Sequence, residues 1–212
     1  MDSCNKAVMI PVSPRRCRLI ASGEEDIEIK KTRPKIEVPF KCYIYCTKKH
    51  GVAFWTGLRY SYADDHSHNA FDRCGNGKVI GEFVCDAVIP MSIEYSDPNS
   101  KCALKEFPYT CLTDKQIIDY LGNGVGGYGW HISDLKIYDQ PKELSDFKRC
   151  LSVVEKKLLY DQDLGYAGLV CDGCPHAKWE NYHLVQCQNA TCASRRVSPP
   201  QNLCYVEELE KI

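Results

Sequence analysis

The sequence predicts an α+β protein with a small mixed β-barrel, short flanking helices and a C-terminal cysteine-rich insertion. Short apolar and β-branched runs are separated by Gly, Pro and Asn, which is typical of strands joined by turns. Helical periodicity is confined to a few short segments that do not alternate with the strands, which argues against a doubly wound parallel sheet. The 212 residues suffice for one elaborated domain or two small ones.

Six segments are expected to be strands. Residues 26–30 alternate polar and apolar side chains, as a half-buried strand does. Residues 78–89 are expected to form a central strand, and the pattern of 130–138 suggests a strand with a kink. The six segments are 8–12, 26–30, 40–47, 78–89, 130–138 and 202–207.

Three segments are expected to be helices. Ser13-Pro14 predicts the start of a helix that ends near Gly23, because serine caps helices and proline suits the first helical position. Residues 113–121 predict a short helix capped by a threonine. Residues 145–160 carry apolar side chains on one side and predict an amphipathic helix. Residues 48–77, rich in Gly, His, Asp and Asn, predict a long loop.

These elements divide the chain into two parts. The barrel is expected to comprise residues 1–147 together with 196–212, and residues 148–195 are expected to form a helix and the cysteine-rich insertion. No stretch of about 18 apolar residues is present, so we expect no membrane-spanning helix and no membrane partner. The first residues lack the basic-then-apolar layout of a signal peptide, which predicts a cytoplasmic location.

The charge pattern allows only a local contact with nucleic acid. The net charge of −1 argues against a protein that coats nucleic acid, because neutralising many phosphates requires a strongly basic surface. Between Arg15 and Lys49, however, ten Lys/Arg stand against five Asp/Glu, a local charge of about +5.

Residues 30–35, the basic turn, are candidates to bind a phosphate. Arginine offers a bidentate fork, lysine a point charge and threonine a hydroxyl donor. The candidate ligands are Lys30, Lys31, Thr32, Arg33 and Lys35. The competing interpretation is a solvated loop that keeps the barrel soluble.

Aromatic and acid–base candidates lie in the strands. Tyr128 and Trp130 could stack on a flat base, but for Trp130 we favour a place in the core with its indole N–H hydrogen-bonded. His131 is a candidate general base, since histidine titrates near neutrality, and Asp134 is a candidate to orient it. Glu82 is a second candidate acid–base group. Structural roles are the competing interpretation for His131 and Glu82.

The fourteen cysteines fall into two kinds. Those in apolar strands, such as Cys42, Cys46 and Cys85, are expected to be small core residues. Four others follow the pattern C-x2-C-x12-C-x4-C, which suits a tetrahedral structural Zn²⁺ site. The candidate ligands are Cys171, Cys174, Cys187 and Cys192, with His176 and His183 as substitutes. Free thiols in a disordered insertion are the competing interpretation.

Several segments resemble a known family. Residues 20–35, from Ile20-Ala21-Ser22-Gly23-Glu24-Glu25 to Arg33-Pro34-Lys35, resemble the "GEKTIEVRK" signature of ASCH domains, which belong to the PUA-like superfamily. Further similarity to the phage and Firmicutes version lies in 40–47, 77–85, 127–144 and the closing strand 199–208. The resemblance covers roughly 6–147 and 196–210.

The resemblance implies a twisted PUA-like barrel with a cleft between the first helix and the basic turn. ASCH domains are generally thought to bind RNA or nucleotides there, and some members are amidohydrolases of N4-acetylcytidine or ribonucleases. The amidohydrolases use a lysine two residues after the signature glycine and a threonine three residues further on. This chain has Glu25 and Glu28 at those positions, and neither acid supplies a nucleophile activated by a lowered lysine pKa.

The sequence therefore predicts binding of RNA or a modified nucleotide, in a cleft lined by the basic turn, Tyr128, Trp130 and His131. Two alternatives stay open. The first is a nucleoside or RNA hydrolase that uses His131 or Glu82 in the same cleft. The second is a phage-associated interaction protein whose cysteine-rich segment binds a host protein.

Overall fold

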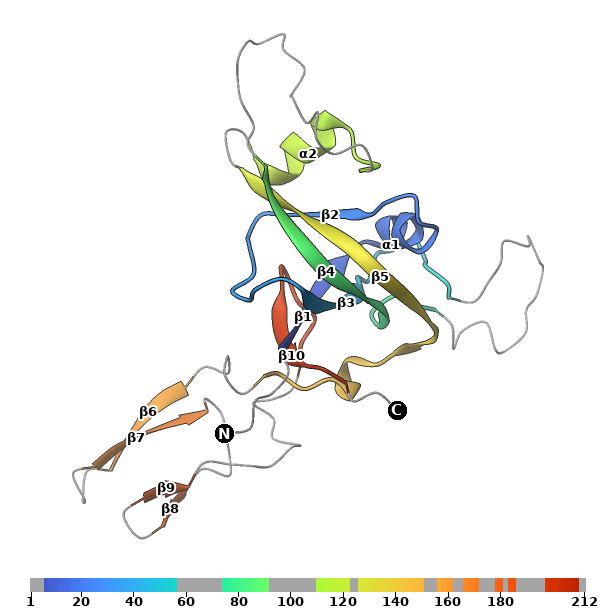
Figure 1. Cartoon of the computed structure of the whole chain (residues 1–212). Coiled ribbons are helices and arrows are strands. Elements are labelled where there is room, and N and C mark those ends of the chain that lie inside the picture. The colour runs from blue at the N-terminus through green and yellow to red at the C-terminus, as the bar shows by residue number, and fades with distance from the viewer. Residues whose placement is uncertain are drawn as a thin grey trace.

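The computed structural model describes residues 6–56, 74–91, 110–122, 126–150, 156–161, 166–171, 178–180, 183–185 and 197–209. Six strands form one mixed sheet in the order β10-β1-β3-β4-β5-β2 (Figure 1). Their bounds are β1 Lys6–Val12, β2 Ile27–Lys30, β3 Phe40–Cys46, β4 Val79–Met91, β5 Gly127–Lys142 and β10 Cys204–Glu207. All six strands predicted from the sequence are present, and β4 is central as expected.

Strands β1 and β3 are parallel, whereas the other neighbouring strands of this sheet are antiparallel. Strands β10 and β2 form the two edges, so the sheet is not closed into the predicted barrel within the described residues. The kink predicted in β5 lies at Asp134, whose φ is 47°, and the register between β4 and β5 shifts at three places. These irregularities bend the long β4–β5 pair.

Two helices flank the sheet. Helix α1 (Pro14–Ala21) follows Ser13 directly, as predicted, and buries Cys17 and Ile20. Helix α2 (Asp114–Leu121) begins with a capping box in which the Thr113 side chain accepts from the backbone of Gln116. None of the helices in the described part of the chain is long and apolar enough to span a membrane.

The helix predicted over residues 145–160 is wrong. A 3-10 turn, η2 (Leu144–Asp146), is followed by an extended Phe147 and by Arg149 in a β-bridge, and a strand begins at Lys156. The reason is tertiary pairing: Arg149 bridges to Val206 of β10, and the buried Phe147 packs edge-to-face on Tyr43. These contacts outweigh the helical periodicity of the segment.

Two short hairpins lie between η2 and β10 in the chain. Strand β6 (Lys156–Asp161) pairs with β7 (Tyr166–Cys171), and β8 (Lys178–Glu180) pairs with β9 (His183–Val185). Both pairs are antiparallel and neither belongs to the six-stranded sheet.

Both faces of the sheet are buried. Alternate side chains of β1 and β3 point to opposite sides and therefore belong to two different core clusters. One cluster contains Val8, Ile10, Cys42 and Ile44 and is covered by α1, while Ala7, Met9, Tyr43 and Tyr45 belong to the cluster on the other face. A third cluster joins α2 to β2 through Ile27, Ile29, Ile117 and Leu121. Helix α2 is therefore fixed over β2, next to the turn that β2 leads into.

At Gly81 the backbones of β4 and β5 approach each other too closely for a larger side chain. A Cβ at this position would lie 2.5 Å from the Lys136 carbonyl oxygen and 3.1 Å from the Ile137 Cα. Because both neighbours are backbone atoms, Gly81→Ala should lower the free energy of unfolding by about 1–3 kcal/mol in urea denaturation. Lys136→Ala removes only an exposed side chain at the same crossing and should change it by less than about 0.5 kcal/mol. Equal stability of the two variants would contradict this packing.

Candidate nucleic-acid interface

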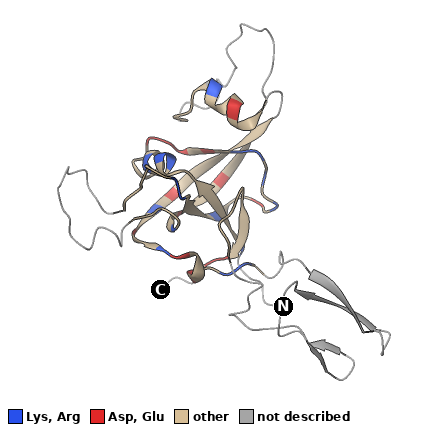
Figure 2. Cartoon of the chain, turned by 180° about the vertical axis from the view of Figure 1, so that it is seen from behind, with Lys and Arg blue, Asp and Glu red and all other residues tan. Residues whose placement is uncertain are grey.

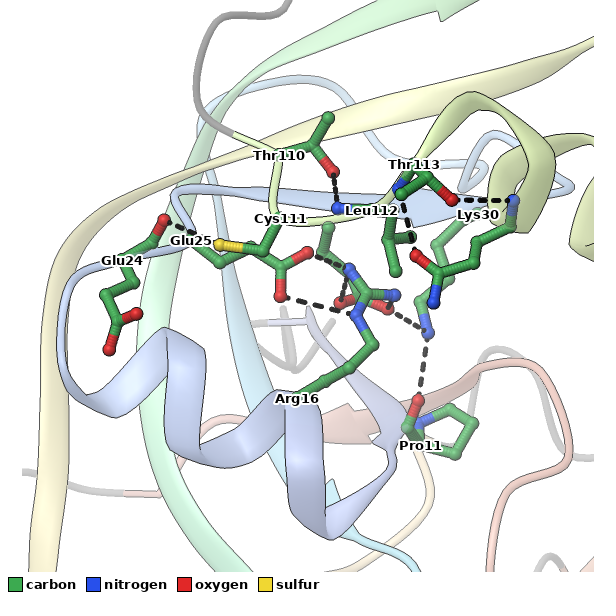
Figure 3. A network of polar contacts seen from close by, with 11 residues as sticks. Pro11, Arg16, Glu24, Glu25, Lys30, Thr110, Cys111, Leu112 and Thr113 are labelled. Atoms are coloured by element: carbon green, nitrogen blue, oxygen red, sulfur yellow. Dashed lines mark hydrogen bonds and ion pairs between the residues drawn. The ribbon is translucent and has the colours of Figure 1, made fainter.

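A buried cluster of four charges, which we call the ion cluster, lies between α1 and β2 (Figure 3). It consists of Arg16, Glu25, Glu28 and Lys30. Arg16 donates to both carboxylates: Nε to Glu25 Oε2 at 3.3 Å, Nη2 to Glu25 Oε1, and Nη1 to Glu28 Oε1 at 3.3 Å. Lys30 Nζ lies 2.9 Å from Glu28 Oε1 and donates to the Pro11 carbonyl at 2.9 Å. The two cations and two carboxylates balance in charge.

The ion cluster explains why β2 is buried along its whole length rather than half-buried as predicted. The apolar residues Ile27 and Ile29 face α2, while Glu28 and Lys30 point to the opposite side and are buried as ion pairs. A strand with alternating polarity can be buried on both faces when its charges find partners.

Burial and pairing change the acid–base properties of the ion cluster. Burial raises the pKa of Glu25 above its ordinary value, although the Arg16 guanidinium opposes this effect. Burial alone would lower the pKa of Arg16, but Glu28 and Glu25 more than offset this and raise it. Arg16 is therefore a permanent cation, and its side chain keeps 17% exposure.

One of the predicted phosphate ligands, Lys30, belongs to the ion cluster and is not at the surface. Lys30 is only 3% exposed and its ammonium is held inside by Glu28 and Pro11, so it does not face a phosphate at the surface. Lys31, Thr32, Arg33 and Lys35 are exposed. Figure 2 shows the cations of the turn after β2 as blue segments of its loop.

The turn after β2 lines a basic groove of about 540 Å³. Its other wall is the start of β10, together with Arg149 from the segment that pairs with β10. The groove is lined by Thr32, Arg33, Lys35, Arg149, Asn202, Leu203, Cys204 and Tyr205. No Asp or Glu is among these lining residues. Three cations thus converge from two parts of the chain more than a hundred residues apart.

Side-chain hydrogen bonds hold the two walls of the basic groove together. Asn202 Nδ2 donates to Thr32 Oγ1 at 2.8 Å, and the Lys35 backbone N–H donates to the Tyr205 hydroxyl at 2.6 Å. The Tyr205 ring also lies 5.5 Å from Lys6 Nζ, which is close enough for a cation–π contact. These bonds join the two walls, and the groove offers cations, an amide and an aromatic ring.

The aromatic residues predicted for the cleft, Tyr128 and Trp130, do not line the basic groove. Trp130 is fully buried in the core, as we favoured, and packs edge-to-face on Phe40 with ring centroids 5.6 Å apart. Its Nε1 has no hydrogen-bond partner, contrary to the sequence expectation. Tyr128 is partly buried against the same cluster. Neither residue lines the basic groove.

The acid–base candidates belong to separate polar groups. His131 Nδ1 lies 2.6 Å from Asp86 Oδ1, so Asp86 rather than the predicted Asp134 orients the imidazole. The Tyr138 hydroxyl donates to Glu82 Oε2 at 2.7 Å. Neither His131 nor Glu82 lines the basic groove.

The predicted zinc ligands fall mostly outside the described residues. Cys171 ends β7, whereas Cys174, Cys187 and Cys192 lie outside the described ranges. Within the residues that the structure does describe, no group of three or more His, Cys, Asp or Glu is placed to hold a metal ion. The three strand cysteines predicted for the core, 42, 46 and 85, are fully buried.

Neither the second wall of the groove nor the pairing within the ion cluster was predicted from the sequence. Arg149, Asn202 and Tyr205 lie far along the chain from the basic turn, and no local pattern connects them to it. A local pattern could have indicated Arg16. It is one of three arginines at the start of α1, and its neighbour Cys17 is on the buried face of the helix.

Comparison with known proteins gives a limited likeness. No family model matches the chain, and no curated protein matches it. Among solved structures, the crystal structure of ASCH from Zymomonas mobilis aligns with 65% of this chain and 73% of that one, with 16% identity and a TM-score of 0.43. A tyrosine-to-phenylalanine mutant of that protein covers 65% of this chain and 76% of its own, with 15% identity and a TM-score of 0.41.

Removing Arg16 should test the ion cluster. Arg16→Met leaves two buried carboxylates with fewer partners, so we expect a loss of about 3–5 kcal/mol in the free energy of unfolding at pH 7.5. Arg15→Met, at the exposed neighbouring position, is the matched control and should lose less than about 0.5 kcal/mol.

The pH dependence of this loss follows from Glu25. A carboxyl whose pKa is raised by folding binds protons that the unfolded state has lost, so its unfavourable contribution grows as pH rises above 4.5, the ordinary value. Without Arg16 the pKa of Glu25 rises further. Urea unfolding should therefore give a smaller deficit for Arg16→Met at pH 5 than at pH 7.5. An equal deficit at both pH values would contradict this assignment.

Proposed function

We propose that this protein binds RNA or a modified nucleotide in the basic groove. The observation that carries the proposal is the convergence of Arg33, Lys35 and Arg149 on one groove without a lining carboxylate. Cations that line one groove together attract an anion, and a phosphate can accept two parallel hydrogen bonds from an arginine. The resemblance to ASCH domains points to the same ligand class and also implies a phage or prophage origin.

The lining of the groove suits a nucleotide better than a free inorganic anion. Its volume of about 540 Å³ is within the usual range for small-molecule sites of roughly 300–1,000 Å³. Tyr205 adds an aromatic ring, while Asn202 keeps an amide oxygen and a second N–H beyond its bond to Thr32. A phosphate, a sugar and a base edge would each meet suitable chemistry. The overall charge of −1 restricts such binding to a short site.

Hydrolysis of a nucleoside or RNA is the second candidate function. The pair of His131 and Asp86 favours it, because a carboxylate 2.6 Å from one ring nitrogen orients the imidazole as a general base. Both side chains are partly exposed, at 38% and 46%. The pair does not line the basic groove, so a hydrolase would need a second contact region on the ligand.

The binding proposal predicts a salt-dependent affinity. Three phosphate contacts to a single strand give a slope of about −2 in log K against log salt, so raising NaCl from 50 to 200 mM should weaken binding about 20-fold. Fluorescence anisotropy with a labelled mixed-sequence RNA measures this. Arg33→Ala should weaken binding about three- to ten-fold and reduce the slope by about 0.7.

Arg15→Ala removes an exposed arginine of α1 outside the groove and serves as the matched control, with affinity unchanged. Binding that does not depend on salt, or equal effects of the two arginine variants, would contradict the proposal. RNA recovered intact after a long incubation would count against the hydrolase.

We also propose a structural Zn²⁺ held by Cys171, Cys174, Cys187 and Cys192, on the strength of their spacing. Metal analysis of protein purified without chelator should find about one equivalent of zinc. Cys174→Ser should release most of it, whereas Cys111→Ser, at an exposed cysteine outside the motif, should not. Less than about half an equivalent in the unaltered protein would contradict the site.

A further inference from the structure

An exposed tyrosine lies beside the basic turn but outside the basic groove. Tyr120, in the last turn of α2, is 39% exposed, and among the described residues only it and Val38 are large apolar side chains with such exposure. Lys31 Nζ lies 5.3 Å from the centroid of the Tyr120 ring. Lys31 directly precedes Thr32, which lines the groove. The ring and the groove are thus linked by consecutive residues of one exposed turn.

Helix α2, which carries Tyr120, is held in a fixed place. The capping box at Thr113 fixes the start of α2, and the buried Ile117 and Leu121 pack this helix on β2. Burial, reinforced by the charge of Glu28, raises the pKa of the Tyr120 hydroxyl, so the ring stays neutral at physiological pH. A neutral, exposed ring on a fixed helix suits stacking, because a tyrosine side chain has few rotatable bonds to immobilise when a flat ligand covers it.

We propose that Tyr120 and Lys31 form a base-stacking subsite that extends the basic groove for a single-stranded RNA. One base stacks on the Tyr120 ring, and Lys31 moves from the ring to the phosphate next to that base. The inference rests on the proposed function, since it continues a strand whose phosphates occupy the groove.

The exchange of partners is favourable for both groups. A cation over an exposed ring is a weak contact, whereas a base stacked on an aromatic side chain is a stronger one. The Lys31 ammonium meanwhile pairs with a phosphate, which carries a full negative charge, instead of with the face of the ring. Lys31 and Arg33 are two residues apart, at most about 7 Å along the backbone, so one short strand can reach both.

The ligand must be single-stranded at this point. A base inside a duplex is stacked on both faces and offers none to Tyr120, while an unpaired base can be splayed onto an aromatic ring. The subsite reads a π-face rather than a hydrogen-bond pattern, so it adds affinity with little sequence preference.

The test compares two RNA lengths. Competition anisotropy would measure the affinities of a mixed-sequence trinucleotide, which fits the groove alone, and of a ten-nucleotide RNA, which also reaches α2. Tyr120→Leu should weaken binding of the ten-nucleotide RNA about ten-fold and leave the trinucleotide unchanged. Tyr120→Phe keeps the ring and should bind both RNAs as the unaltered protein does. Thermal unfolding midpoints of both variants check that α2 still folds.

Each outcome separates this inference from the proposed function. If Arg33→Ala weakens binding of the ten-nucleotide RNA but Tyr120→Leu does not, the subsite is overturned and the groove stands. If Tyr120→Leu weakens the trinucleotide equally, the tyrosine acts on the groove and the subsite is also overturned. If neither RNA binds the unaltered protein, both proposals fail.

Discussion

The rest of the structure depends on how Arg16 is held between two buried carboxylates. Taking charges out of water is costly, and each of Glu25, Glu28 and Lys30 would be unfavourable at its position without its partners. The pairing makes their burial possible and joins three elements that are weakly connected otherwise: Arg16 comes from α1, the acids from the loop after it and from β2, and Lys30 donates back to the end of β1. The start of the turn after β2 is therefore fixed relative to the sheet. This also fixes the wall of the basic groove that the turn forms.

The same arrangement divides the basic turn into cations of two kinds. By composition, Lys30, Lys31, Arg33 and Lys35 form one basic run, but the first is an internal ion-pair partner and the others are exposed. The charge of Lys30 is balanced by a buried carboxylate and therefore attracts a ligand only weakly. Arg33 and Lys35, in contrast, line a groove together with Arg149, and no Asp or Glu is among the lining residues. Attraction for an anion therefore arises from the part of the run beyond β2.

Local patterns predicted the sheet well because its strands carry strong signals. The apolar run of β1, the aromatic and cysteine-rich run of β3 and the threonine cap of α2 are properties of a few neighbouring residues. The predicted helix over 145–160 failed where a distant strand competes for the backbone: the Cys150 N–H donates to the Tyr205 carbonyl, a bond that periodicity cannot reveal. Because local patterns do not reveal contacts between distant segments, only one wall of the groove could be predicted from the sequence. Its basic wall is one segment, whereas the facing wall comes from residues about 170 positions later. Trp130 was correctly expected in the core because a large aromatic in a central strand has more to gain from burial than from exposure.

The ion cluster also bears on which chemistry the chain can perform. The resembling amidohydrolases place a lysine and a threonine where this chain has Glu25 and Glu28, and a lysine there works as part of a nucleophilic pair only when its proton is easily lost. Here both positions are acids whose charges are matched by Arg16 and Lys30, and burial further favours the protonated form of Glu25. An acid already engaged by a guanidinium offers neither a free base nor a nucleophile. The charges at this position stabilise the fold, whereas Arg33, Lys35 and Arg149 line the groove. The chain thus uses one set of cations to balance buried carboxylates and leaves Arg33 and Lys35 exposed in the groove.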